Sequence, residues 1–147
     1  MNLIDALLGE HGAFHALLDS VEQMASTAGD VAQIDAAMAI LATEVNAHAA
    51  LEEKLLFPAL ENHSGAKELL AEMVAEHGAI RRGLEMIEEA RDISEAVEAV
   101  QQTISVARRH FRNEETVLYV LAQEALDDET LTRLGEAWAA ARSVKIR

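Results

Sequence analysis

The sequence predicts an all-α protein, an up-down-up-down four-helix bundle followed by a short fifth helix at the C-terminus. Three observations support this. The 147 residues include one proline and seven glycines, with many Ala, Leu and Glu residues that favour helix. Apolar residues recur at three- and four-residue spacing, without the alternation typical of strands. The connections are short, which makes neighbouring helices antiparallel. We expect one domain over residues 1–147, with the bundle over about 2–126 and the last helix over about 128–144.

The first two predicted helices each carry one continuous apolar face. The first runs over about 2–27, with Ile4, Leu7, Leu8, His11, Phe14, Leu18 and Val21 on that face. Asp30 is a candidate N-cap for the second helix. The face of the second helix carries Ile34, Met38, Leu41, Val45, His48, Glu52 and Leu55. Pro58 falls near its end, where a kink or a tightened last turn is expected.

The remaining helices have recognisable boundaries. The connection ENHSGAK at 61–67 precedes a third helix that extends to about Arg91. Asp92 and Glu95 have the spacing of a capping box, which predicts a fourth helix over about 93–126. Asp127 or Asp128 then opens the fifth helix, whose basic last residues suit a helix C-terminus.

Composition and charge exclude several classes of partner. The net charge of −14 argues against a nucleic-acid partner, because no basic stripe could neutralise a phosphate backbone. Anionic membrane surfaces are disfavoured for the same reason. No segment is apolar enough to span a bilayer and no signal peptide is recognised, so we expect a cytoplasmic protein. The chain has no cysteine, which excludes disulfides and thiolate metal sites.

Two sequence patterns occur twice. EHGA stands at 10–13 and again at 76–79, and H-x-x-x-E-E-x-x-L begins at His48 and again at His110. The first predicted helix thus resembles the third, and the second resembles the fourth. The chain is expected to form two helical hairpins related by a pseudo-two-fold axis.

The second repeat directs ligand-type side chains into the core. At 100° per residue, His48 and Glu52 lie about 40° apart on one helix face, as do His110 and Glu114. That face is apolar in both helices: Val45 and Leu55 flank the first pair, and Ala107, Val117 and Leu121 flank the second. The next residues, Glu53 and Glu115, are predicted to point away as ordinary surface carboxylates.

The first repeat adds two more imidazoles. His11 lies between Leu7 and Leu18 on its face, and His77 lies between Met73 and Leu84. Ionised carboxylates are costly in a core unless they are paired or bind metal. Imidazole and carboxylate donors suit iron, manganese or zinc, and two carboxylates suit a two-metal site. The alternative is a purely structural network of buried hydrogen bonds.

The order His11, His48-x-x-x-Glu52, His77, His110-x-x-x-Glu114 resembles the hemerythrin-like, or HHE cation-binding, domain, of the bacterial type. The resemblance covers nearly the whole chain through Leu126. It implies a non-haem di-iron centre with an oxo or hydroxo bridge, in which Glu52 and Glu114 bridge the irons. His11 and His48 would hold one iron, and His77 and His110 the other. Manganese or zinc is a less favoured occupant.

Two departures separate this chain from the oxygen-carrying hemerythrins. Those proteins have H-x-x-x-H on the third helix and H-x-x-x-x-D on the fourth, whereas here Met73 precedes His77 by four residues and the fourth helix has H-x-x-x-E. Iron–sulfur-cluster repair proteins share the bundle, but their preceding cysteine-bearing segment is missing from this sequence.

Four further side chains bear on the site. His15 lies one turn from His11, so it is either an extra iron ligand, a hydrogen-bond partner of a ligand, or an interface residue. Its repeat counterpart, Arg81, cannot be a ligand. His63 is expected to be exposed, and Trp138 to serve packing. Tyr119 is predicted to lie on the far side of its helix from Glu114, which argues against a tyrosinate ligand.

The resemblance implies binding of, or reaction with, oxygen, hydrogen peroxide or nitric oxide, including a catalase- or peroxidase-like activity. The alternative is iron or oxygen sensing, or iron storage, without turnover. Without His15 as a ligand, both irons keep an open position, which suits two-electron chemistry on peroxide. With it, one iron is closed, as in the oxygen carriers. The redox partner is not predicted.

Overall fold

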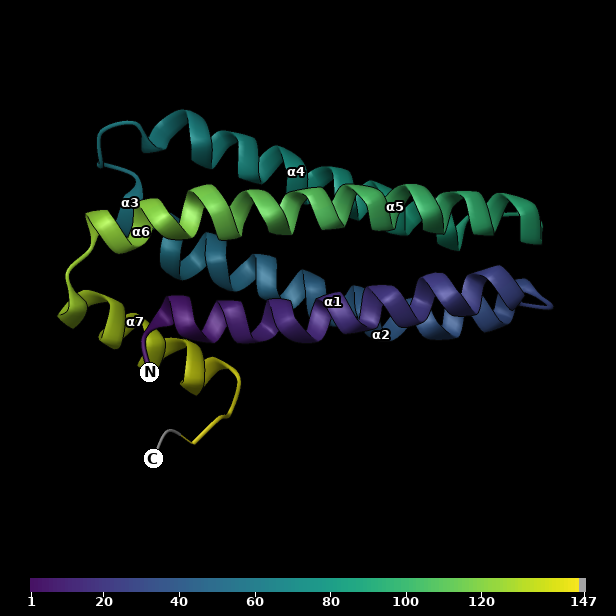
Figure 1. Cartoon of the computed structure of the whole chain (residues 1–147), viewed down its shortest axis with the longest axis horizontal. Helices are drawn as coiled ribbons and strands as arrows, with labels where there is room; N and C mark the ends of the chain where they lie inside the picture. The colour runs from purple at the N-terminus through teal and green to yellow at the C-terminus, as the bar shows by residue number, and fades with distance from the viewer. Residues whose placement is uncertain (146–147) are drawn as a thin grey trace.

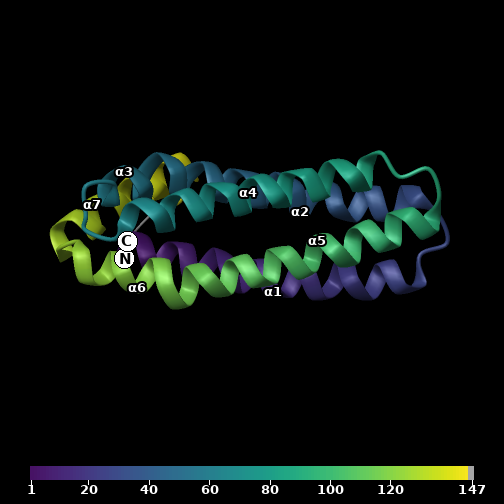
Figure 2. The same ribbon diagram turned by 90° about the horizontal axis from the view of Figure 1, so that it is seen from above.

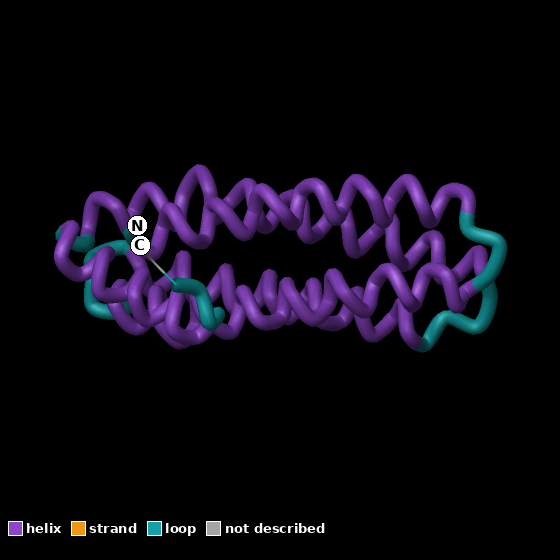
Figure 3. Tube along the Cα trace, turned by 90° about the horizontal axis from the view of Figure 1, so that it is seen from below, coloured by secondary structure: helices purple, strands orange, loops and turns teal. Residues whose placement is uncertain are grey.

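Four long antiparallel rods form a bundle in the computed structural model of this protein, which describes residues 1–145 (Figures 1 and 2). The rods are, in order, α1 (Leu3–Thr27); α2 (Val31–Leu51) continued by η1 (Glu52–Leu56) and α3 (Phe57–Leu60); α4 (Ala66–Glu88); and α5 (Ile93–Asn113) continued by η2 (Glu114–Leu118) and α6 (Tyr119–Ala125). The shorter α7 (Asp128–Ala141) packs against α1. Figure 3 shows helices and loops only over the described residues. The predicted fold class is confirmed.

Side-chain caps set most of the helix starts. Asp30 accepts a hydrogen bond from the Gln33 N–H, and Asp127, rather than Asp128, caps α7. Asp92 accepts from the Glu95 N–H, as its spacing predicts. The Glu95 carboxylate, however, accepts from the Arg91 N–H and guanidinium instead of closing a capping box. The third helix ends at Glu88, three residues before the predicted boundary.

The segments η1 and η2 are π-helical turns at equivalent positions of the two repeats. The Phe57 N–H donates to the Glu52 carbonyl, and the Tyr119 N–H to the Glu114 carbonyl, so each bond spans five residues. A π turn inserts an extra residue and brings the fifth residue back to the starting face. Pro58 follows directly, in the first turn of α3, where proline is tolerated.

These turns shift the buried face and overturn part of the predicted core. Val117, expected inside, is 48% exposed, while its neighbour Leu118 is fully buried. In the same way Leu55 and Leu121 are only partly buried, and Leu56 lies in the core instead. Leu8 on α1 is also exposed, because it lies at the edge of the apolar face rather than at its centre.

Two apolar clusters fill the bundle, one on each side of a polar layer. The cluster toward α7 includes Leu7, Leu56 and Tyr119, and the opposite cluster includes Phe14, Val45 and Ala107. Between them lie the buried histidines and glutamates. Trp138 is buried in the first cluster, as predicted. Over residues 1–145, none of the helices is long and apolar enough to cross a membrane.

Candidate metal centre

The polar layer consists of six residues predicted from the two repeats. None is more than 3% exposed: His11, His48, Glu52, His77, His110 and Glu114. Their ligand atoms form two groups, each with all atoms within 4.8 Å of one another. One contains His11 and His48, the other contains His77 and His110, and both contain Glu52 and Glu114. The structure therefore brings all six together with the carboxylates shared between two halves.

Each of the four imidazoles is oriented by a carboxylate outside this layer. His11 Nδ1 lies 2.9 Å from Glu115 Oε1 and His77 Nδ1 lies 2.8 Å from Glu53 Oε1. His48 Nδ1 and His110 Nδ1 donate in the same way to Glu10 Oε2 at 2.6 Å and Glu76 Oε2 at 2.7 Å. A carboxylate holds its hydrogen-bonded nitrogen as the donor, which leaves Nε2 to bind a cation. All four Nε2 atoms face the centre of the layer.

The two inner carboxylates lie between the halves. Glu114 Oε1 is 2.7 Å from His110 Nε2, and its Oε2 is 3.1 Å from His11 Nε2 in the other half. Glu52 likewise lies 3.5 Å from His48 Nε2 and 3.3 Å from His77 Nε2. Yet Oε2 of both glutamates is buried, and its contacts with the imidazole nitrogens lack the geometry of a hydrogen bond. Buried polar atoms in native proteins nearly always have a partner, so these oxygens fit a metal ion.

The electrostatic environment favours positive charge. Burial lowers the pKa of His77, but the close contacts of its ring with the Glu114 and Glu52 carboxylates outweigh burial and raise this pKa to about 10. Burial also lowers the pKa of His48, but the negative charge of Glu52 holds this pKa well above its usual value. Burial raises the pKa of Glu114, but the close contacts of its carboxylate with the His11 and His110 imidazoles bring this pKa well below its ordinary range. A metal cation that displaces these protons enters the same favourable field.

Aromatic rings enclose the imidazoles. Phe111 is fully buried, and its ring centroid lies 4.6 Å from that of His11. Phe57 stacks on His77 with ring centroids 5.9 Å apart and planes 8° apart. Tyr119, at the position equivalent to Phe57, donates its hydroxyl hydrogen to Glu52 Oε1 at 2.6 Å. These rings surround the imidazoles with aromatic side chains.

Three expectations about this region were wrong. Tyr119 lies in the centre, with Oη 3.0 Å from His11 Nε2, because η2 returns the fifth residue after Glu114 to the inward face. Glu53 and Glu115 are not idle surface carboxylates, since each accepts a hydrogen bond from a histidine on a neighbouring helix. A residue about 100° from the inward direction faces the adjacent helix of a bundle rather than solvent.

The roles of Glu10 and Glu76 were not predicted from the sequence patterns. Both begin an EHGA copy, directly before His11 and His77, and each orients the histidine of the adjacent helix instead of its own neighbour. The repetition of the whole tetrapeptide, and not of the histidine alone, was the available signal. The repeat therefore specifies an oriented imidazole from one helix and its outer acceptor from the next.

His15 lies outside both groups of ligand atoms. Its side chain is 43% exposed, and its Nε2 is 2.9 Å from Glu115 Oε1, the same oxygen that orients His11. His15 thus contacts the outer carboxylate that orients His11, and not one of the six central residues. His63 is exposed, as predicted.

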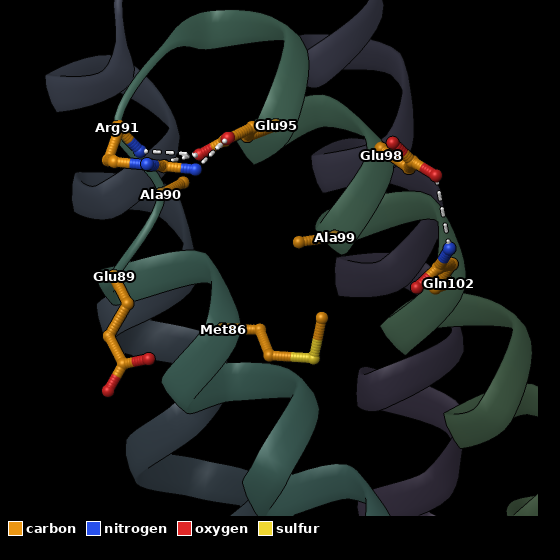
Figure 4. A pocket seen from close by; sticks show the side chains of 8 residues that line it. All are labelled: Met86, Glu89, Ala90, Arg91, Glu95, Glu98, Ala99 and Gln102. Atoms are coloured by element: carbon orange, nitrogen blue, oxygen red, sulfur yellow. Dashed lines mark hydrogen bonds and ion pairs between the residues drawn. The ribbon is translucent and has the colours of Figure 1, made fainter.

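A surface hollow between α4 and α5 lies at the end of the bundle away from α7 (Figures 1 and 4). Its lining includes Met86, Ala99 and the exposed Arg91–Glu95 ion pair. None of the six central residues contributes to it. The buried layer, rather than this hollow, is therefore the candidate functional site.

Comparison with known proteins agrees with the resemblance found in the sequence. The family model "Hemerythrin HHE cation binding domain" matches residues 2–122. A crystal structure of a hemerythrin HHE cation binding domain-containing protein from Mycobacterium kansasii, a homolog of Rv2633c, has a TM-score of 0.81 and 23% sequence identity. The match covers 97% of this chain and 86% of that chain, and at this identity it establishes the fold alone. No curated protein matches the chain.

Proposed function

The chain belongs to the Hemerythrin HHE cation binding domain family, and from this premise we propose that its buried layer holds two iron ions. His11 and His48 would bind one ion, His77 and His110 the other, and Glu52 and Glu114 both. Three features support this proposal: the two overlapping donor groups, the inward Nε2 atoms, and the unpartnered carboxylate oxygens. The donor set suits iron, with manganese and zinc as alternatives.

We propose that this centre converts hydrogen peroxide, and that oxygen and nitric oxide are further small ligands. The position of His15 favours peroxide conversion over oxygen carriage. Because it bonds Glu115 instead of joining the centre, the two halves present equal donor sets, and neither is capped by a fifth imidazole. A small molecule could therefore engage both halves at once. The nearly complete burial of the six residues excludes larger substrates.

Two bound iron ions would supply the redox chemistry for the balanced reaction of two H2O2 to two H2O and one O2. The protein's own residues orient, protect and hold protons. The outer carboxylates fix the four rings, and Phe111 with Phe57 keeps bulk water away. Tyr119 holds a proton at Oη beside Glu52, since burial and the charge of Glu52 raise its pKa well above the usual value.

The test combines metal content with turnover. The protein is loaded with ferrous iron without oxygen and desalted, and its oxygen evolution from hydrogen peroxide is then measured with an oxygen electrode. We expect turnover in the wild type and its loss, together with most of the iron, in Glu52→Ala and Glu114→Ala. His63→Ala, an exposed histidine, is the control and should retain both.

Reversible oxygen binding without oxygen evolution would refute the enzymatic proposal and favour a carrier or sensor. Iron loss in His63→Ala equal to that in Glu114→Ala would contradict the assignment of the centre itself. The two failures are distinguishable, because the first leaves iron content intact.

A further inference from the structure

The C-terminal helix reaches the candidate centre through one arginine. Arg142 is the C-cap residue of α7, and its Nη2 lies 2.6 Å from Glu10 Oε1. The other oxygen of Glu10 accepts the Nδ1–H of His48 at 2.6 Å. A continuous chain of contacts therefore links the guanidinium, one outer carboxylate and one inner imidazole. The Arg142 side chain is 18% exposed, which limits screening of its charge by solvent.

The equivalent carboxylate in the other half has a neutral partner. Glu76 orients His110, and its second oxygen accepts a hydrogen bond from Asn113 Nδ2 at 2.9 Å. Among residues 1–145, no lysine or arginine forms an ion pair with Glu76 or with Glu53, the other outer carboxylate of that half. The charge of Arg142 therefore acts through an outer carboxylate on the His11–His48 half only.

The other two outer carboxylates, Glu53 and Glu115, also favour the His77–His110 half. Glu53 accepts a hydrogen bond from His77 alone, whereas Glu115 is shared between His11 and the exposed His15. In the His77–His110 half, both outer carboxylates therefore accept hydrogen bonds only from the two histidines and from the neutral amide of Asn113. The His11–His48 half has one carboxylate paired with a guanidinium and one divided between two imidazoles.

We propose that Arg142 makes the two metal positions unequal, so that a divalent cation fills the His77–His110 position first and the His11–His48 position second. This inference rests on the proposed two-metal centre. An outer carboxylate strengthens a metal-bound imidazole by accepting its Nδ1–H. Pairing Glu10 with Arg142 withdraws part of that negative charge, and the guanidinium also repels a cation held by His48. Arg142 is a positioning residue in this scheme, acting through Glu10.

The experiment is an anaerobic calorimetric titration of the metal-free protein with ferrous iron. We expect two binding steps in the wild type. His110→Ala should remove the tighter step and His48→Ala the weaker one. Arg142→Gln should tighten the weaker step by about tenfold, at the low end of the effects of outer partners on metal affinity. Arg142→Lys, which keeps the charge, should retain most of the separation.

Two matched variants complete the design. Arg91→Gln removes the same charge from an exposed ion pair in the connection between α4 and α5 and should leave both steps unchanged. Glu44→Gln removes the second carboxylate partner of Arg142, which lies 3.3 Å from its Nη1 and is 49% exposed. With its charge less neutralised, Arg142 should weaken the second step further. This variant keeps Arg142 in place and tests the inference if Arg142→Gln does not fold.

An unchanged separation in Arg142→Gln, accompanied by a lower melting temperature, would show that the arginine only fastens α7 and would overturn the inference. Filling of the His11–His48 position first would also overturn it. Binding of two equivalent ions would contradict the inference but not the proposed function. Failure to bind two ions at all would contradict both.

Discussion

Glu53 provides the sharpest contrast between the sequence pattern and the structure. The helical pattern describes it as a surface carboxylate, whereas its Oε1 lies 2.8 Å from His77 Nδ1. A hydrogen bond to a charged group contributes about 1.5–3 kcal/mol. Because the Glu53 side chain is 35% exposed, water replaces part of this interaction, and we take the low end. Glu53→Ala should therefore cost about 1.5 kcal/mol of metal-binding free energy, or about tenfold in affinity.

The assay is calorimetric titration of metal-free Glu53→Ala with Zn2+, whose lack of redox chemistry isolates binding. One of the two binding steps should weaken and the other should not. Glu61→Ala, which removes an exposed carboxylate in the following turn, is the control. Equal affinities in the two variants would refute the argument that outer carboxylates set the ligand strength of the imidazoles.

The other predictions concern pH and the buried phenol. The pKa of His77, raised to about 10, makes the metal-free protein lose stability as pH rises from about 7 through 10, because this contribution is complete only below the ordinary histidine pKa. Metal binding displaces that proton, so metal affinity should rise over the same pH range; thermal melts and titrations at several pH values check both signs. Tyr119→Phe leaves Glu52 Oε1 without its 2.6 Å hydrogen bond and should destabilise the metal-free protein by about 1–3 kcal/mol, measured by urea unfolding. An unaltered unfolding midpoint would show that this bond contributes nothing.

Much of the centre could be predicted from the sequence because its ligands obey simple α-helical geometry. His48 and Glu52 are one turn apart, and the same pair recurs at His110 and Glu114 on an equally apolar face. The aspartate caps were also predicted, since Asp30 and Asp92 stand directly before periodic segments. The fold and the meeting of these side chains follow from periodicity together with composition, short connections and the internal repeat.

The features of the centre that could not be predicted depend on departures from regular helical geometry or on contacts with neighbouring helices. Nothing in a regular 3.6-residue period reveals η1 and η2. Val117 was therefore expected in the core, where the structure places Leu118 instead. Tyr119 was misplaced for this reason. Glu10 and Glu115 were missed because their role lies across a helix–helix interface, which a single-helix projection does not describe.

The structure also gives a physical reason for placing π turns at the glutamates. Each turn places two inward side chains close together along the helix: Glu52 with Phe57, and Glu114 with Tyr119. A regular helix would place the aromatic ring about 140° away. The turns therefore allow a charged carboxylate and its enclosing ring to share one face. At the position of this ring, the two repeats differ only in the hydroxyl group of Tyr119.

Metal content after anaerobic loading tests the central claim most directly. The protein is incubated with ferrous iron, passed over a desalting column and analysed for iron by mass spectrometry, alongside Glu114→Ala. Two overlapping donor groups predict about two iron ions per wild-type chain, and a large loss in the variant. Fewer than about one ion per wild-type chain, with an unchanged variant, would contradict the account and leave the buried layer as a hydrogen-bond network.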